Sequence, residues 1–277
     1  MIGMEQKFIK EIEIIGLWGR KHFHWKDVRP DVNILVGING SGKSTLIHLL
    51  WGLLSDNHKH LKKYDFSELR LTCSDGSQMV FDNVGKKATK IPVDMPVQMI
   101  STFDVVPSKV QKTESPLCSE LMDVIYTTGK GRFSFFDYRL KAVNFPDQAP
   151  TIHSNIKKLF ELIDRQFERT GKSIRIDVNT NTVVFDHGGH TVRLEDLSSG
   201  EKQFLLIMLK IFLMEEKPAV LLMDEPEISL HIDWQHELIN VIRVLNPHCQ
   251  IIMSTHSPSI FGDGWGEFVT FADEITE

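Results

Sequence analysis

The chain has 277 residues, of which 42% are hydrophobic and 25% charged, a balance typical of a soluble globular protein with a substantial core. Its net charge of −6 excludes an overall basic surface for nucleic acid, although a local basic patch over residues 20–26 stays open. The cysteines stand far apart in sequence, which favours reduced thiols over a disulfide framework; they are Cys73, Cys118 and Cys249.

The N-terminus has charges within its apolar stretch, so we expect no signal peptide. The longest apolar run, residues 204–214, is too short to cross a bilayer and contains Lys210. These features predict a soluble, cytoplasmic protein. The histidine pairs of the sequence HFH and HKH, at residues 22–24 and 58–60, have no neighbouring cysteine or carboxylate cluster, so we interpret them as surface histidines.

The first third of the chain alternates between strand patterns and one helix pattern. Alternating apolar residues predict strands over residues 7–15, 21–25 and 32–37. A glycine-rich turn and an apolar helix over 43–54 follow. Further strands are expected over residues 68–73, 78–84 and 96–102.

The middle of the chain, about residues 105–195, reads as a mainly helical insertion. Residues 104–151 are the least regular part and contain four prolines. Helices are predicted over residues 119–128 and 151–171, and a hairpin over 173–186. The end of the chain then alternates a helix after residue 198, a strand over 219–227, a helix over 233–245 and a strand over 249–258. This order predicts an α/β fold with a mainly parallel sheet core and an N-terminal antiparallel strand region.

The stretch GINGSGKST, residues 37–45, follows a strand and precedes a helix, as the P-loop pattern G-x-x-x-x-G-K-[ST] requires. Its glycines let backbone N–H groups face a polyphosphate, and the helix N-terminus adds its positive dipole end. Lys43 can neutralise the β- and γ-phosphates, and Ser44 can bind Mg²⁺. The residues predicted to bind ATP here are Gly37, Asn39, Gly40, Ser41, Gly42, Lys43, Ser44 and Thr45.

The apolar strand AVLLMDEPE ends in two acids, Asp224 and Glu225. Ligands of open α/β sheets bind at the carboxyl ends of the strands, where these acids lie. Asp224 is therefore predicted to hold Mg²⁺, and Glu225 to orient or deprotonate the attacking water.

The segment LSSGEKQ places two serines and a glycine at the mouth of an apolar helix. Ser198 and Glu201 form the capping box S-x-x-E, which accounts for a well-capped core helix. Capping alone does not account for Gly200 beside a second serine, Ser199, and a helix mouth is also a site for an anion.

Taken together, these motifs resemble those of ABC-type ATPases. LSSGEKQ resembles the signature motif, AVLLMDEPE the Walker B strand, PEISLHIDWQ the D-loop, and STHSP supplies a switch histidine, His256. The order matches that of the family and covers most of the chain. The resemblance implies one ATPase domain over residues 1–277, with lobe I at 1–104 plus 196–277 and a mainly helical signature lobe II at about 105–195.

The resemblance also implies a second copy of the chain. Two subunits of such ATPases pack head to tail, and each nucleotide lies between one P-loop and the opposite signature. Ser198, Ser199 and Gly200 would therefore contact ATP bound to another chain. Glu225, His256 and Lys43 would carry hydrolysis, with ATP and Mg²⁺ as cofactors and Ser44 and Asp224 as metal ligands.

The variants LSSGEKQ and DEPEISLH resemble the soluble branch, which includes recombination, SMC-type and overcoming-lysogenisation-defect ATPases and those of abortive-infection and antiphage systems. No long heptad segment or appended nuclease is expected. We therefore expect a stand-alone ATPase that drives a nuclease or toxin effector, DNA or both, in bacterial antiviral defence and away from membranes. The alternatives are the nucleotide-binding subunit of a transporter and an ATP-binding scaffold with little turnover.

Two assignments stay open at this stage. The glutamine that should follow the strand over 96–102 has two imperfect candidates, Gln98 and Gln111. An aromatic residue upstream of the P-loop, Phe23 or Trp25, could stack on adenine, but a position in the core is the stronger interpretation for each.

Overall fold

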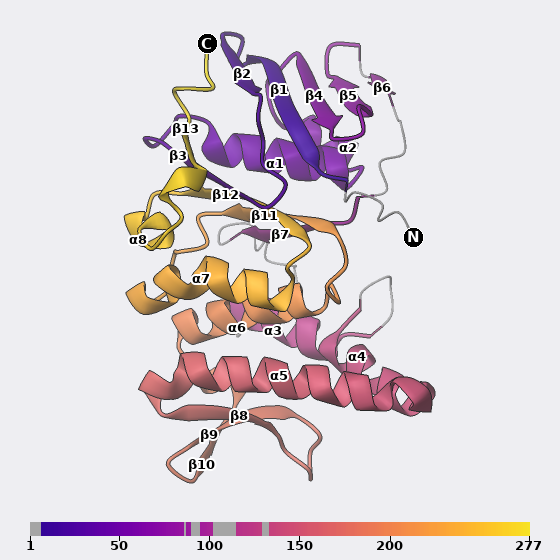
Figure 1. The fold of residues 1–277 in the computed structure, drawn as a ribbon, viewed down its shortest axis with the longest axis vertical. Coiled ribbons are helices and arrows are strands. Elements are labelled where there is room, and N and C mark those ends of the chain that lie inside the picture. Colours follow the sequence, from indigo (N-terminus) through magenta and orange to yellow (C-terminus); the bar gives the residue numbers. More distant parts are fainter. Residues whose placement is uncertain (1–6, 86, 90–94, 102–114, 129–132) are drawn as a thin grey trace. The chain divides into compact units, whose positions relative to one another are not determined.

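The computed structural model describes residues 7–85, 87–89, 95–101, 115–128 and 133–277. The chain forms two compact units (Figure 1). Unit 1 comprises Met1–Thr102, Glu216–Glu227 and His248–Glu277, and unit 2 comprises Phe103–Glu215 and Ile228–Pro247. No helix among the described residues is long and apolar enough to cross a membrane.

A parallel sheet in the strand order β13-β3-β12-β11-β7 forms the centre of unit 1. Every residue of β11 and β12 is buried, which explains why both read as unbroken apolar runs. The strands are β3 (Val32–Val36), β7 (Val97–Ser101), β11 (Ala219–Asp224), β12 (Cys249–Thr255) and β13 (Val269–Phe271).

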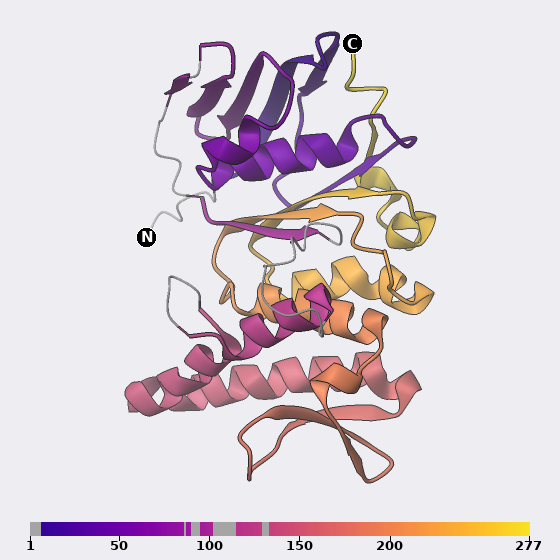
Figure 2. The same cartoon turned by 180° about the vertical axis from the view of Figure 1, so that it is seen from behind.

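An antiparallel sheet in the order β2-β1-β4-β5-β6 forms the other layer of unit 1. Helix α1 (Lys43–Leu54) lies between the two sheets, and both of its sides are buried (Figures 1 and 2). One hydrophobic core joins Ile12 of the antiparallel sheet, Leu46 of α1 and Ile252 of the parallel sheet. The remaining elements are β1 (Ile9–Leu17), β2 (Lys21–Trp25), α2 (His58–Leu61), β4 (Glu68–Cys73), β5 (Gln78–Asp82), β6 (Lys87–Thr89), α8 (Pro258–Phe261) and the 3₁₀ helix Gly266–Phe268.

Unit 2 is mainly helical, with a small antiparallel sheet in the order β10-β9-β8. A run of aromatic rings packs in its core. The ring centroid of Trp234 lies 5.1 Å from that of Phe204 and 5.4 Å from that of Phe167. The Phe167 ring in turn stacks on Phe185, with centroids 5.1 Å apart. The helices are α3 (Pro116–Tyr126), α4 (Phe135–Asn144), α5 (Ala149–Phe167), α6 (Ser199–Phe212) and α7 (Ile232–Leu245), with 3₁₀ turns at Pro146–Gln148, Glu168–Thr170 and Leu194–Asp196. The strands are β8 (Lys172–Ile176), β9 (Val183–His187) and β10 (His190–Val192).

The predicted α/β class, with a parallel core and an N-terminal antiparallel region, is confirmed. The boundary between the lobes differs from the expected one, because α6 and α7 belong to unit 2 and not to the unit of the parallel sheet. Phe204 of α6 and Trp234 of α7 both belong to the run of aromatic rings in unit 2. Helix α4 was not predicted, although Ser134 and Asp137 form a capping box at its start.

Candidate nucleotide-binding site

The loop between β3 and α1 has the backbone shape that a phosphate cradle needs. Gly40 and Gly42 adopt φ angles of 77° and 110°, which side chains disfavour. A Cβ on Gly42 would also come within 2.8 Å of the Phe23 ring, and one on Gly37 within 2.9 Å of the Ala272 Cβ. All three glycines are therefore required by conformation or by close approach.

Lys43 begins α1 and is only 4% exposed. Its Nζ donates hydrogen bonds to the carbonyl oxygens of Gly37 at 2.8 Å and Ile38 at 3.1 Å, and lies 3.4 Å from Ser41 Oγ. The loop thus curls around the ammonium group. The N-terminus of α1 has no side-chain cap and no acid in its first turn, so its N–H groups are left for an anion.

Burial and the nearby carboxylates shift the pKa of Lys43 in opposite directions. Burial lowers the pKa of Lys43, and the negative charges of Glu225, Asp224 and Glu227 act in the opposite direction without restoring it. The acids at the end of β11 therefore lie close enough to the P-loop lysine for their charges to act on it.

Asp224 ends β11 and is 3% exposed. Ser254 Oγ, from the neighbouring strand β12, donates to its Oδ1, and His48 Nε2 of α1 lies 3.5 Å from its Oδ2. Burial raises the pKa of Asp224, but hydrogen bonds from His48, Ser254 and Ser44 outweigh that effect and place it below its usual value. Ser44 and Asp224 thus present a hydroxyl and an ionised carboxylate to each other, the oxygen donors that suit Mg²⁺.

Glu225 follows in the left-handed backbone region, with φ 47°, and its N–H donates to the Ser254 carbonyl at 3.0 Å. Non-glycine residues rarely adopt this conformation, and such residues gather at functional sites. The turn brings Glu225 Oε1 to 3.4 Å from His256 Nε2, which follows β12. A carboxylate and an imidazole at this distance can share the handling of a proton.

Glu227 is a site residue that was not predicted from the sequence. Its Oε1 accepts hydrogen bonds from Thr255 Oγ1 at 2.7 Å and from the His256 N–H at 2.8 Å. Its Oε2 is buried without a hydrogen bond among the described residues. Glu227 therefore fixes the backbone at His256. The sequence feature that could have indicated its role is the fourth residue of DEPE, where transporter subunits usually have threonine.

The aromatic residues suggested for adenine lie in the core, since Phe23 is 0% and Trp25 4% exposed. Trp18 is an exposed aromatic residue beside the P-loop; its ring would contact a Cβ on Gly42, and its centroid lies 5.3 Å from Lys21 Nζ. Trp18 is thus the better placed side chain for stacking on a base.

The Q-loop glutamine stays open. Gln98 pairs with Leu221 inside the parallel sheet, and its amide donates to the Met99 carbonyl at 3.1 Å. Gln111 lies outside the described residues.

The signature-like segment lies in unit 2. Ser198 caps α6, and the capping box closes in both directions, with 2.8 Å from Ser198 N to Glu201 Oε2 and 3.3 Å from Glu201 N to Ser198 Oγ. Burial raises the pKa of Glu201, but bonds from Lys172 and Ser198 hold it below the usual value. Ser198 and Ser199 are exposed.

Packing within unit 2 accounts for the glycine at position 200. A Cβ on Gly200 would collide with the carbonyl oxygen of Ser229, which itself adopts a φ of 70°. The segment before α7 thus crosses directly over the start of α6, and only glycine allows that approach. Packing explains Gly200, and the phosphate interpretation of this segment must rest on its serines.

Unit 1 therefore contains residues 37–45, Asp224, Glu225 and His256, and unit 2 contains residues 198–200. Asn39 of the loop is exposed, and Thr45 is half-buried in the first turn of α1. Within unit 1, Ser44 contacts Asp224, and Glu225 contacts His256.

Comparison with known proteins identifies the family. A family model described as "AAA domain, putative AbiEii toxin, Type IV TA system" matches residues 121–262, about half of the chain. The chain belongs to this family. The match includes Ser198, Asp224, Glu225 and His256, and the P-loop lies N-terminal to it.

Two curated proteins and one solved structure are similar over most of the chain. The Septu protein PtuA of Bacillus thuringiensis is 22% identical over 288 residues, which cover 90% of this chain and 72% of PtuA. A probable metal transport system ATP-binding protein of Chlamydia pneumoniae is 27% identical over 80% of this chain and 66% of its own length, slightly under two thirds.

The solved structure is an SMC head bound to the C-terminal winged-helix domain of ScpA. It superposes with a TM-score of 0.53 at 16% identity and covers 92% of both chains. At this identity the likeness concerns the fold alone, which is that of an SMC head.

Proposed function

We propose that the chain binds Mg·ATP through its P-loop and hydrolyses it, that two copies close head to tail around the nucleotides, and that this cycle drives an effector protein in antiviral defence. The observation that carries the proposal is the convergence of Lys43, Ser44, Asp224 and the Glu225–His256 pair in unit 1. These groups come from the P-loop and from the ends of two neighbouring strands, as P-loop chemistry requires.

The roles follow from the charges of these groups. Lys43 exchanges its contacts with loop carbonyls for phosphate oxygens, and the uncapped start of α1 adds N–H donors. Ser44 and Asp224 would hold Mg²⁺, which neutralises charge between the phosphates. Glu225 accepts the proton of the attacking water, and His256, held by Glu227, stabilises the charge that develops on phosphate.

A second copy of the chain completes the site in this proposal. Support comes from the exposed hydroxyls of Ser198 and Ser199 at the start of α6 and from the SMC-like fold. Gly200 would let the helix start approach a phosphate, but its local packing already accounts for it.

The biological role rests on the comparisons. The family description names an abortive-infection toxin and a toxin–antitoxin system, and PtuA is similar over 90% of the chain. A nuclease or toxin is therefore the effector we favour, with DNA as the second candidate target. DNA binding would need a local basic patch and would weaken steeply with salt.

The second candidate function is a transporter's nucleotide-binding subunit, favoured by the 27% identity to the Chlamydia protein. Transporter subunits usually have the motifs LSGGQ and DEPT, and the departures LSSGEKQ and DEPE in this chain count against that function. Co-purification with a membrane protein would favour the transporter, whereas loss of phage resistance on deletion of the gene would favour defence.

Glu225→Gln tests the ATPase proposal. The variant should bind ATP normally, because Asp224 and Lys43 are intact, and lose about 10²–10⁴-fold in turnover, because the amide cannot accept a proton. Light scattering should then show a stable dimer with ATP. Glu267→Gln, an exposed acid of unit 1, is the matched control. Turnover at the wild-type rate, or a monomer saturated with ATP, would contradict the proposal.

A further inference from the structure

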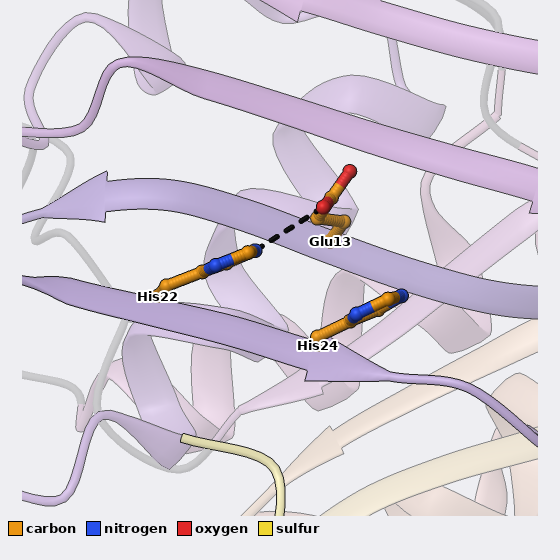
Figure 3. A group of neighbouring side chains, drawn as sticks. All are labelled: Glu13, His22 and His24. Atoms are coloured by element: carbon orange, nitrogen blue, oxygen red, sulfur yellow. Dashed lines mark hydrogen bonds and ion pairs between the residues drawn. The ribbon is translucent and has the colours of Figure 1, made fainter. Parts of the chain in front are cut away.

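A cluster of histidines and carboxylates covers one face of the β1–β2 ribbon, away from the P-loop chemistry. Strand alternation turns Phe23 and Trp25 of β2 into the core and leaves His22 and His24 side by side on the other face. Glu13 of the neighbouring strand β1 pairs directly with His24 (Figure 3). The expectation that no carboxylate cluster accompanies His22 and His24 is therefore wrong, because strand pairing brings in acids from β1.

The donor atoms of this cluster already point at one another. His22 Nε2 lies 3.2 Å from Glu13 Oε1, and His24 Nε2 lies 2.6 Å from Glu11 Oε1. The two imidazole rings are stacked, with centroids 5.9 Å apart and planes 5° from parallel. One donor atom each from Glu13, His22 and His24 fall within 4.8 Å of one another, and Figure 3 shows both rings reaching toward β1.

We propose that Glu13, His22 and His24 form a binding site for a divalent transition metal such as Zn²⁺, with Glu11 beside it as a fourth donor. Two imidazoles and a carboxylate are a donor set that zinc uses. Donors around a tetrahedral zinc lie about 3.3 Å apart, as bond lengths of about 2.0–2.1 Å require. The His22–Glu13 pair already has that spacing at 3.2 Å, and the His24 donor atom lies within 4.8 Å of both.

Arg70 of β4 supports the cluster from the opposite side. Its Nη1 donates to Glu13 Oε2 at 2.8 Å, which leaves Oε1 directed at His22, and its Nη2 pairs with Glu68. A donor that holds the second oxygen of a ligating carboxylate orients the first, as outer-shell partners of metal ligands do. The Glu13 side chain is only 16% exposed, so this orientation is held by packing as well.

The site lies on the strand that pairs with the last described residues. His22 exchanges two backbone hydrogen bonds with Glu277, at 2.9 and 2.8 Å, and the His24 N–H donates to the Ile275 carbonyl at 2.8 Å. A metal that joins β2 to β1 would therefore also fix the strand on which residues 275–277 are held. The site differs in kind from the nucleotide site, because Mg²⁺ prefers oxygen donors and discriminates against imidazole.

The experiment titrates Co²⁺, and then Zn²⁺, into the full chain, freed of any affinity tag and stripped of metal, with excess Mg²⁺ present. The wild type should bind one Co²⁺ per chain with visible absorption bands of nitrogen coordination, and Zn²⁺ should abolish the bands. His22→Gln and His24→Gln should each weaken binding by more than a hundredfold. Arg70→Gln should weaken it about tenfold to a hundredfold, the usual effect of losing an outer-shell partner.

His58→Gln is the matched control, because His58 forms a single carboxylate pair with Asp56 at 3.2 Å in the same unit. It should bind metal like the wild type. Circular dichroism without metal should be the same for all variants. Zn²⁺ should raise the melting temperature of the wild type and the control most, and that of His22→Gln and His24→Gln least. Absence of stoichiometric Co²⁺ binding to the wild type, or equal binding by His22→Gln and the control, would overturn the proposal.

Discussion

The two helix starts that the sequence marks as anion sites are built in opposite ways. Helix α1 begins after Gly42, with no side-chain cap and no acid in its first turn. Helix α6 begins after Ser198, whose hydroxyl and the Glu201 carboxylate close a capping box. The first N–H groups of any helix need partners. At α6 the Ser198 hydroxyl accepts from the Glu201 N–H, whereas no side chain caps α1.

This difference separates a ligand site from a surface that a ligand can approach. In the proposed function a phosphate binds at the start of α1, where Lys43 lies inside the loop at 4% exposure. At α6 the cap leaves hydroxyls, chiefly that of Ser199, as the groups that remain for a second molecule. Loss of the positive charge of Lys43 should therefore weaken ATP binding itself. A substitution at Ser199 should affect only the closure between subunits.

Lys43→Ala should have the largest effect. ATP affinity should fall about a hundredfold or more, because a hydrogen bond from a charged donor contributes about 1.5–3 kcal/mol and the ammonium can reach two phosphates. Titration with a fluorescent ATP analogue measures the change. Lys10→Ala, an exposed lysine of β1, is the control. Unchanged affinity with intact circular dichroism would place the nucleotide elsewhere.

Ser199→Arg tests the other helix start without touching its cap. A bulky cation at this exposed position should block closure onto a facing nucleotide and abolish hydrolysis, while ATP still binds at the P-loop. Mixed with Lys43→Ala, about half the dimers are hybrids with one good site of two. About a quarter of wild-type activity should return if the sites act independently.

Nucleotide trapping at a single site is the readout if hydrolysis needs both sites. Normal activity of Ser199→Arg alone would show that α6 faces no nucleotide. Failure of mixing to restore either hydrolysis or trapping would count against sites shared between subunits.

The sequence predicted those parts of the site whose chemistry is local. The P-loop glycines, Lys43 and the acids after β11 follow from short motifs, because a strand, a turn and a helix start are set by neighbouring residues. Glu227 was not found, because its partners at Thr255 and His256 lie on another strand.

The same limit applies to Gly200 and to the lobes. The carbonyl that excludes a side chain at Gly200 comes from Ser229, and only the folded chain brings the two together. Likewise, the sequence of α6 shows an apolar helix but not which unit its apolar faces pack against. In the structure Phe204 of α6 stacks on Trp234 of α7 within unit 2.

Glu201→Gln should lower stability at pH 7 by about 2–3 kcal/mol, somewhat below the cost for a fully buried pair, because Lys172 is 18% exposed. The pKa of Glu201 is depressed in the folded state, so its contribution is present above the ordinary glutamate pKa. That contribution is lost as pH falls through the folded value. Urea unfolding of both proteins should show a difference that shrinks toward acid; a constant difference would mean that the charge is not its source.

Ser198→Ala should have the smallest effect, about 1 kcal/mol of stability, the usual cost of losing a helix cap. The loss is modest because the Glu201 carboxylate still accepts from the residue 198 N–H, so only one direction of the box is removed. Ser199→Ala is the matched control, since it removes an exposed hydroxyl one residue further on and should change the free energy of unfolding in urea by less than about 0.5 kcal/mol.

Steady-state ATP hydrolysis then separates the two functions of the segment. If Ser198 acts only as a cap, its variant should keep nearly full turnover well below the unfolding transition, whereas a contact with a facing phosphate would reduce turnover by more than the stability loss explains. Equal stability of the two alanine variants would mean that the capping box at α6 contributes nothing to the free energy of unfolding. The two helix starts would then not differ in the way described.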